Sequence, residues 1–108
     1  SKLERDTMYS QMIETYENIL SNSNSLETQK QSAQEEIKKI NDIKNSIMIC
    51  ENLIKTKGLD QCVIFVNGKS VSVVIGAEEL TQEQIAQVQN IVSREMNAQV
   101  ENIHISTK

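Results

Sequence analysis

The sequence contains few of the residues that interrupt regular structure. Its 108 residues include no proline, no tryptophan, three glycines and a single phenylalanine. Proline breaks helices because it lacks a backbone N–H and clashes with the preceding turn, and glycine weakens them because it loses the most freedom on folding. The composition therefore favours a helix-rich chain, and the length is that of one domain.

The chain also lacks an excess of basic residues and any long apolar run. Lys and Arg number 11 against 15 Asp and Glu, and Lys38-Lys39 is the only basic cluster. Nucleic-acid binding requires a basic face that neutralises phosphates, so we do not expect it. No segment approaches the ~18 apolar residues of a membrane span, and no signal-peptide pattern is present. Because the chain starts without Met inside helix-like sequence, we expect a membrane anchor, if there is one, to lie upstream.

Residues capable of catalysis or metal binding are few and isolated. His104 is the only histidine, and no set of Cys, His, Asp and Glu at ligand spacing accompanies it. Neighbouring carboxylates such as Glu35-Glu36 diverge by ~100° on a helix and make poor acid–base partners. We therefore predict no catalytic residue, no cofactor and no metal site, and a protein that is not an enzyme.

The two cysteines, Cys50 and Cys62, form neither a disulfide framework nor a CxxC pair. Cys50 falls on the apolar stripe of a predicted helix, and Cys62 falls on the inward face of a predicted strand. This placement favours two buried free thiols that pack as small apolar side chains. A bridge between them is the alternative.

Helical spacing of apolar residues predicts two helices in the first half of the chain. The first covers residues 2–20 and is followed by a Ser/Asn loop, in which Asn24 and Glu27 resemble a capping box. The second covers residues 26–57 and ends at Gly58 in a left-handed conformation. Its apolar stripe consists of Ala33, Ile37, Ile40, Ile43, Ile47, Cys50 and Ile54. Because this helix is longer than a small sheet can cover, residues 1–47 are predicted to project as a helical hairpin from a module at 48–108.

Two short apolar runs flank Asn67-Gly68, which is a strong hairpin signal. A two-residue Asn67-Gly68 loop places Val66 opposite Lys69. The inward face then consists of Cys62, Ile64, Val66, Val71, Val73 and Ile75. The other face carries Val63, Phe65 and Val74. These three are candidates for a ring or subunit contact, and the alternative is that they are tolerated as scattered surface residues.

A third helix begins with Thr81 as N-cap and Gln84 as its capping-box partner. Its predicted buried stripe consists of Ile85, Val88, Val92 and Met96, with Ile91 at the margin. The final strand would point Ile103 and Ile105 inward and His104 outward. The fold class is therefore α+β with the order α-α-β-β-α-β, in which a three-stranded sheet packs on helices.

The α-β-β-α-β order of residues 48–108 is shared by small ring-forming domains and by KH-type RNA-binding modules. The RNA-binding modules need a Gly-X-X-Gly loop that clamps the nucleic-acid backbone. Gly58, Gly68 and Gly76 lie too far apart to form such a loop. The pattern therefore favours assembly over RNA binding.

Four segments resemble the stage III sporulation protein AH family of endospore-forming bacteria. They are Glu51-Asn52-Leu53-Ile54-Lys55-Thr56-Lys57-Gly58, Val71-Ser72-Val73-Val74-Ile75, Glu79-Leu80-Thr81 and Glu101-Asn102-Ile103-His104-Ile105. With the long helices that precede them, the resemblance covers nearly the whole chain. It is carried by the order of these segments along the chain.

The resemblance implies a non-catalytic structural role. Members of this family are anchored in the mother-cell membrane by an N-terminal transmembrane helix. Their extracytoplasmic domain lies between the mother cell and the forespore and binds stage II sporulation protein Q. Together with other stage III sporulation proteins they form a channel-like complex. The domain resembles the ring-building motif of type III secretion ring proteins, which implies assembly into a homo-oligomeric ring.

Two regions are candidates for the partner interface. The final strand has a free side whichever strand it pairs with, and a free strand edge is a template for strand addition. Its candidate residues are Glu101, Asn102, Ile103, His104, Ile105 and Ser106. The candidates in the helical hairpin are Tyr9, Met12, Ile13 and Tyr16. The alternative function is an unrelated soluble adaptor that docks through this hairpin.

Overall fold

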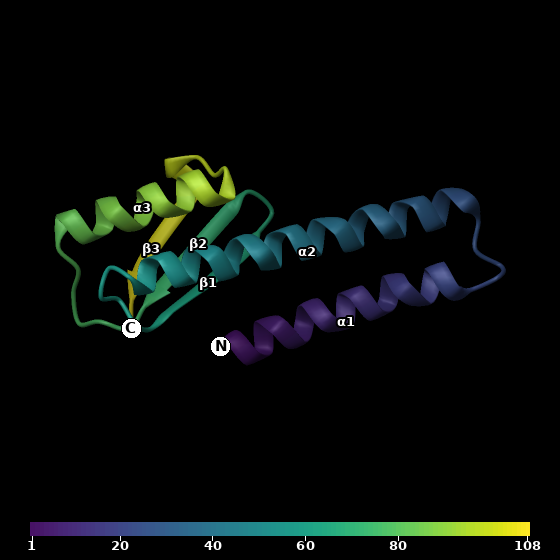
Figure 1. Ribbon diagram of the computed structural model, residues 1–108, viewed down its shortest axis with the longest axis horizontal. Helices are drawn as coiled ribbons and strands as arrows, with labels where there is room; N and C mark the ends of the chain where they lie inside the picture. Colours follow the sequence, from purple (N-terminus) through teal and green to yellow (C-terminus); the bar gives the residue numbers. More distant parts are fainter. The chain divides into compact units, whose positions relative to one another are not determined.

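The structure is a computed structural model that describes residues 1–108. The elements follow in the order α1 (Lys2–Ser21), α2 (Glu27–Lys55), β1 (Cys62–Asn67), β2 (Ser70–Ile75), α3 (Gln82–Met96), the 3₁₀ helix η1 (Val100–Asn102) and β3 (Ile103–Thr107) (Figure 1). This order confirms the predicted α+β fold. The chain separates into two compact units, residues 1–44 and 45–108, and the division falls inside α2.

The first unit consists of α1 and the first part of α2, which form an antiparallel hairpin (Figure 1). The hydroxyl of Ser1 caps α1 by accepting a hydrogen bond from the Glu4 N–H at 3.3 Å. The expected capping box of Asn24 with Glu27 is wrong. The Gln29 side chain accepts from the Leu26 N–H at 2.8 Å, and α2 begins at Glu27, so this contact lies two residues further along the chain than the expected one.

Helix α2 buries a narrow seam. Ala33, Ile40, Ile47 and Ile54 recur every seven residues and are each at most 4% exposed, while Ile37 and Ile43 between them are half-buried. A seven-residue repeat is the periodicity of coiled-coil packing. The burial of these residues confirms the predicted stripe. The helix ends at Lys55, and Gly58 follows with φ +86°, a left-handed conformation that glycine adopts without steric cost.

The sheet has the strand order β1-β2-β3. β1 and β2 form an antiparallel hairpin, and β3 pairs with β2 in parallel. The expected hairpin register is wrong by two residues, because Asn67 pairs with Ser70 and the loop is Gly68-Lys69. In this loop only Gly68 has positive φ. A type I′ turn needs two such residues, so the loop instead forms the kind of turn that has glycine at its first position. An even shift leaves each side chain on its expected face.

The core of the second unit lies on one face of the sheet. Cys62, Ile64, Val71, Val73 and Ile75 are at most 3% exposed, which confirms the predicted inward face except next to the turn, where Val66 is half-buried. The helical residues buried with them are Ile47, Cys50 and Ile54 of α2 and Val88, Ile91 and Val92 of α3. Ile91 was expected at the margin but is only 5% exposed, and Ile85 is half-buried instead.

Helix α3 begins as predicted. The Thr81 hydroxyl accepts from the Gln84 N–H at 3.0 Å, and the Gln84 side chain accepts from the Thr81 N–H at 2.9 Å. The helix ends at Met96, and its C-cap Asn97 adopts the left-handed conformation with φ 51°. This cap turns the chain into η1 and places β3 beside β2.

Candidate interaction surfaces of the sheet

One edge of the sheet is formed by β3. The Lys108 N–H donates to the Ile75 carbonyl of β2 at 2.9 Å. Backbone groups alternate in direction along a strand, so Ser106 and His104 face β2 like Lys108, whereas Ile105 and Thr107 face away from it. No other part of the chain pairs with the N–H and C=O groups of Ile105 and Thr107. This edge is therefore open at its C-terminal end.

The predicted partner segment 101–106 divides into groups with different roles. The N–H groups of Asn102 and Ile103 are used inside η1, where they donate to Gln99 and Val100. Ile103 is buried, Ile105 is half-buried, and Glu101, His104 and Ser106 are exposed. The open edge extends one residue beyond the predicted segment, to Thr107. Sequence reasoning missed Thr107 because the direction of its N–H depends on the pairing register.

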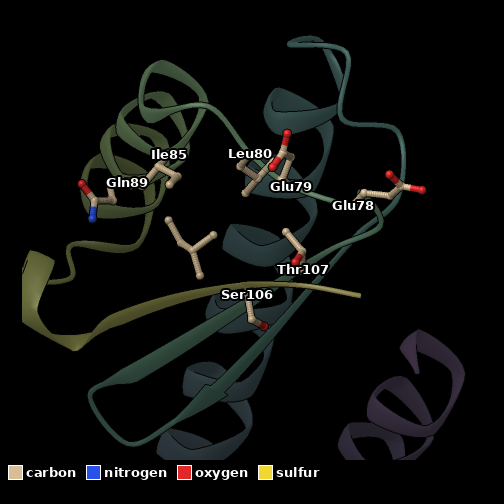
Figure 2. A pocket seen from close by; sticks show the side chains of 8 residues that line it. Glu78, Glu79, Leu80, Ile85, Gln89, Ser106 and Thr107 are labelled. Atoms are coloured by element: carbon tan, nitrogen blue, oxygen red, sulfur yellow. The ribbon is translucent and has the colours of Figure 1, made fainter.

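A groove lies beside this edge, between β3, the start of α3 and the loop that precedes it (Figure 2). Its volume is about 610 Å³. The residues that line it are Glu78, Glu79, Leu80, Ile85, Gln89, Ile105, Ser106 and Thr107. The apolar lining residues are half-buried, and both glutamates are exposed. The groove thus combines an incompletely covered apolar surface with an acidic rim.

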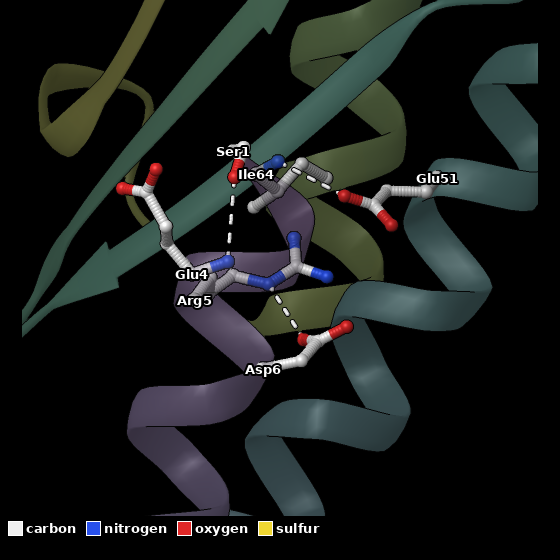
Figure 3. A network of polar contacts seen from close by, with 6 residues as sticks. All are labelled: Ser1, Glu4, Arg5, Asp6, Glu51 and Ile64. Atoms are coloured by element: carbon white, nitrogen blue, oxygen red, sulfur yellow. Dashed lines mark hydrogen bonds and ion pairs between the residues drawn. The ribbon is translucent and has the colours of Figure 1, made fainter.

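The opposite edge is formed by β1 and is occupied at Ile64. The Gly76 N–H donates to the Gln61 carbonyl at 2.8 Å, so by the same alternation the backbone of Ile64 faces away from β2. The Ile64 N–H donates to the Glu51 carboxylate of α2 at 3.0 Å (Figure 3). A side chain of the protein itself therefore takes the place that an added strand would use.

The outer face of the sheet carries the predicted ring-contact residues. Val63 lies directly opposite Val74, and Phe65 lies opposite Ser72. All four side chains are half-buried, and His104 beside Ser72 is exposed. The structure therefore brings Val63, Phe65 and Val74 together on one face, with Ser72 and His104 beside them.

The four candidate residues of α1 differ in accessibility. Tyr9 is 5% exposed, and burial raises the pKa of its phenol, an effect that the Arg5 charge opposes. Met12 is 38% exposed, and Ile13 and Tyr16 are half-buried. Arg5 is also buried and forms an ion pair with Asp6 at 3.0 Å (Figure 3). Met12 is thus the most accessible of the four and Tyr9 the least.

Few side chains of the types that act in catalysis or metal binding are placed together. Cys50 and Cys62 are buried free thiols, as predicted, and burial raises the pKa of Cys50 to about 12, with a further contribution from the Glu95 charge. No group of three His, Cys, Asp or Glu side chains is placed to hold a metal ion. None of the helices combines the length and apolarity needed to cross a membrane.

These features define a small α+β protein with one open sheet edge beside an apolar groove. The chain belongs to the family described as SpoIIIAH-like protein, whose model matches residues 1–105. This match confirms the family resemblance seen in the sequence and argues against the alternative of an unrelated adaptor.

A solved structure supports the fold. The chain is similar to a chain in the structure of the SpoIIQ-SpoIIIAH pore-forming complex, with a TM-score of 0.82 and 15% sequence identity. The match covers 99% of this chain and 90% of the other. A comparison with the curated proteins found no match. At this level of identity, the structural likeness establishes the shared fold.

Proposed function

We propose that this protein is a non-catalytic structural component of a channel complex between mother cell and forespore. It binds the extracytoplasmic domain of stage II sporulation protein Q (SpoIIQ) and lies in the intermembrane space, held by an anchor in the mother-cell membrane. Family membership over residues 1–105 and the likeness to a chain of a SpoIIQ-containing complex support the choice of partner.

The open edge of β3 is the observation that carries the binding proposal. Unpaired N–H and C=O groups on an edge strand can pair with a strand of another chain, and main-chain hydrogen bonds then supply affinity. Ile105 and Thr107 present such groups, whereas the outward amide of Ile64 on the other edge already has an acceptor. β3 is therefore the favoured place for partner addition.

Proline scanning of β3 tests this proposal. Thr107→Pro removes an N–H that faces away from β2, so we expect the fold to persist while affinity for the SpoIIQ domain falls about tenfold, as for one lost interfacial hydrogen bond. Calorimetric titration and thermal melting measure the two effects. The matched control is Ser106→Pro, which removes an N–H that faces β2 and should lower the melting temperature.

Two results would reject the proposal. One is absence of wild-type binding at tens of micromolar with both domains folded. The other is unchanged affinity in a folded Thr107→Pro variant. Proline at Asn102 or His104 is a weaker test, because both N–H groups point toward partners within the fold.

The outer face of the sheet is proposed as the contact that assembles a ring. Val63, Phe65 and Val74 form an apolar patch that a neighbouring copy could cover. If so, the wild type should form larger species in sedimentation velocity when SpoIIQ is present, and Phe65→Ser should abolish them. Ser72→Ala, on the same face directly opposite Phe65, should leave them intact. Larger species that persist in Phe65→Ser would show that this face is simply exposed.

The helical hairpin, predicted at residues 1–47, is proposed as a second contact for the partner. Met12, Ile13 and Tyr16 offer partly accessible apolar surface for it. We expect fast hydrogen exchange across residues 2–24 in the free protein and slower exchange after SpoIIQ is added, because few contacts stabilise this segment locally. Exchange as slow as that of α3 in the free protein would contradict this expectation.

A further inference from the structure

The groove beside β3 has a composition that selects one kind of occupant. Leu80, Ile85 and Ile105 contribute apolar surface that is only half-buried. Glu78 and Glu79 line the same groove, are exposed and form no ion pair. No basic residue lines it. Its volume of about 610 Å³ lies within the ~300–1,000 Å³ of typical ligand pockets, so one or two side chains fit.

The position of the groove relates it directly to the open edge. A strand added to β3 would pair with the backbone of Ile105 and Thr107. Directly opposed residues share a face of the sheet, so the residue opposite Ile105 would point the same way as the Ile105 side chain, which lines the groove. The groove would therefore receive a side chain of the added strand.

The charges lie at one end of the groove. Figure 2 shows Glu78, Glu79 and Thr107 toward one end, and Ile85 and Gln89 toward the other. The residue opposite Thr107 lies two positions from the residue opposite Ile105, since side chains alternate between faces with period two. A cationic side chain at that position could reach the glutamates.

We propose that the groove is a specificity pocket for a partner strand that carries an aliphatic residue and, two positions away, a Lys or Arg. The aliphatic side chain covers Leu80, Ile85 and Ile105, and the cation contacts Glu78 and Glu79. This inference rests on the proposed role of the β3 edge. It adds which side chains the edge accepts, since backbone pairing alone would accept almost any extended segment.

A random decapeptide library displayed on phage provides a test that needs no knowledge of the partner. Panning on the wild-type protein should enrich peptides with an aliphatic residue separated by one position from Lys or Arg at least twofold over the unselected library. Gln89→Trp should fill the groove and abolish the enrichment. Asn90→Trp, at the exposed neighbouring position on α3, is the matched control and should retain it.

Charge reversal keeps the test decisive if Gln89→Trp fails to fold. The double variant Glu78→Lys with Glu79→Lys changes exposed residues, so it should fold normally and shift the enriched residue from Lys or Arg to Asp or Glu. The proposal is overturned if the wild type enriches no such pattern, or if a folded groove variant enriches the same one.

Titration of the same variants with the SpoIIQ domain separates this inference from the proposed function. Loss of affinity in both Thr107→Pro and the glutamate double variant, at least tenfold in each, supports both. Loss in Thr107→Pro alone keeps the edge as the interface but rejects the groove as its specificity pocket. If the wild type does not bind SpoIIQ, the proposed function fails, and the peptide selection still decides the groove.

Discussion

The two edges of the sheet differ in composition and in how far the protein itself covers them: β1 is mostly apolar, whereas β3 alternates Ile103 and Ile105 with polar residues. On β1, the outward N–H of Ile64 donates to Glu51, a side chain that α2 supplies from within the same unit. On β3, the outward groups of Ile105 and Thr107 meet no such side chain, and a groove lies beside them. Natural proteins generally protect edge strands from unwanted pairing. An edge left open next to a protected one is therefore the better candidate for an interaction.

The largest difference between the edges should appear in packing. Ile64 is 0% exposed, whereas Ile105 is half-buried. Ile64→Ala should lower the free energy of unfolding by about 2–5 kcal/mol, as buried Ile→Ala changes do. Ile105→Ala should cost at most about half as much, because part of that side chain is already in water. Urea unfolding of both variants measures this, and equal losses would mean that the edges are packed alike.

Removing the Glu51 carboxylate, which accepts the outward N–H of Ile64 in β1, should give the next largest effect on stability. Glu51→Ala leaves the Ile64 N–H without its acceptor, and hydrogen bonds to charged groups contribute ~1.5–3 kcal/mol. We expect a loss near the lower end, since this bond is only part-buried. The newly open edge should also promote concentration-dependent self-association, measurable by sedimentation. Glu51→Gln, which keeps an acceptor oxygen, is the control and should associate no more than the wild type.

The buried thiol of Cys50 should make the free energy of unfolding fall at alkaline pH. Because burial raises its pKa in the folded protein to about 12, the neutral thiol is favoured by folding. Its stabilising contribution is complete below the unfolded pKa of ~8.5 and is lost as pH rises toward 12. Urea unfolding between pH 7 and 10.5 should show this decline, and Cys50→Val should reduce it. Identical pH profiles would contradict the effect.

The smallest expected effect involves no change in stability. The amide of Ile64 should exchange slowly with solvent because Glu51 accepts its hydrogen, whereas the amides of Ile105 and Thr107 should exchange much faster. Ser106 between them faces β2 and should be protected. Residue-resolved hydrogen exchange by NMR measures this alternation. Uniform protection along residues 103–107 would show that the β3 edge is already paired.

Much of the fold could be predicted from local patterns. The N-cap of α3 was visible because Thr81 and Gln84 are only three residues apart, and the seam of α2 was visible as a helical repeat. The face assignment of the hairpin was also correct. Its register was not, because Asn67-Gly68 matches a type I′ turn and the structure instead uses Gly68 at the first loop position. Alternation determines faces, but only the turn conformation determines which residues are opposite.

The candidate surface was predictable only in part. That β3 has a free side followed from its place at the end of a three-stranded sheet. Which of its amides are free depended on parallel pairing with β2 and on η1, which uses the N–H groups of Asn102 and Ile103. Glu51 gave no sign of a special role, because a glutamate on an amphipathic helix normally faces solvent.

By itself, the sequence determined the element order, the inward face of the sheet, the N-cap of α3 and the buried cysteines, all of which follow from local patterns in the chain. The tertiary structure decided the strand order, the acceptor of the Ile64 amide and the groove between β3 and α3. These features bring together residues far apart in sequence, such as Leu80 and Ile105. Their backbone directions follow from long-range pairing, which side-chain periodicity does not encode.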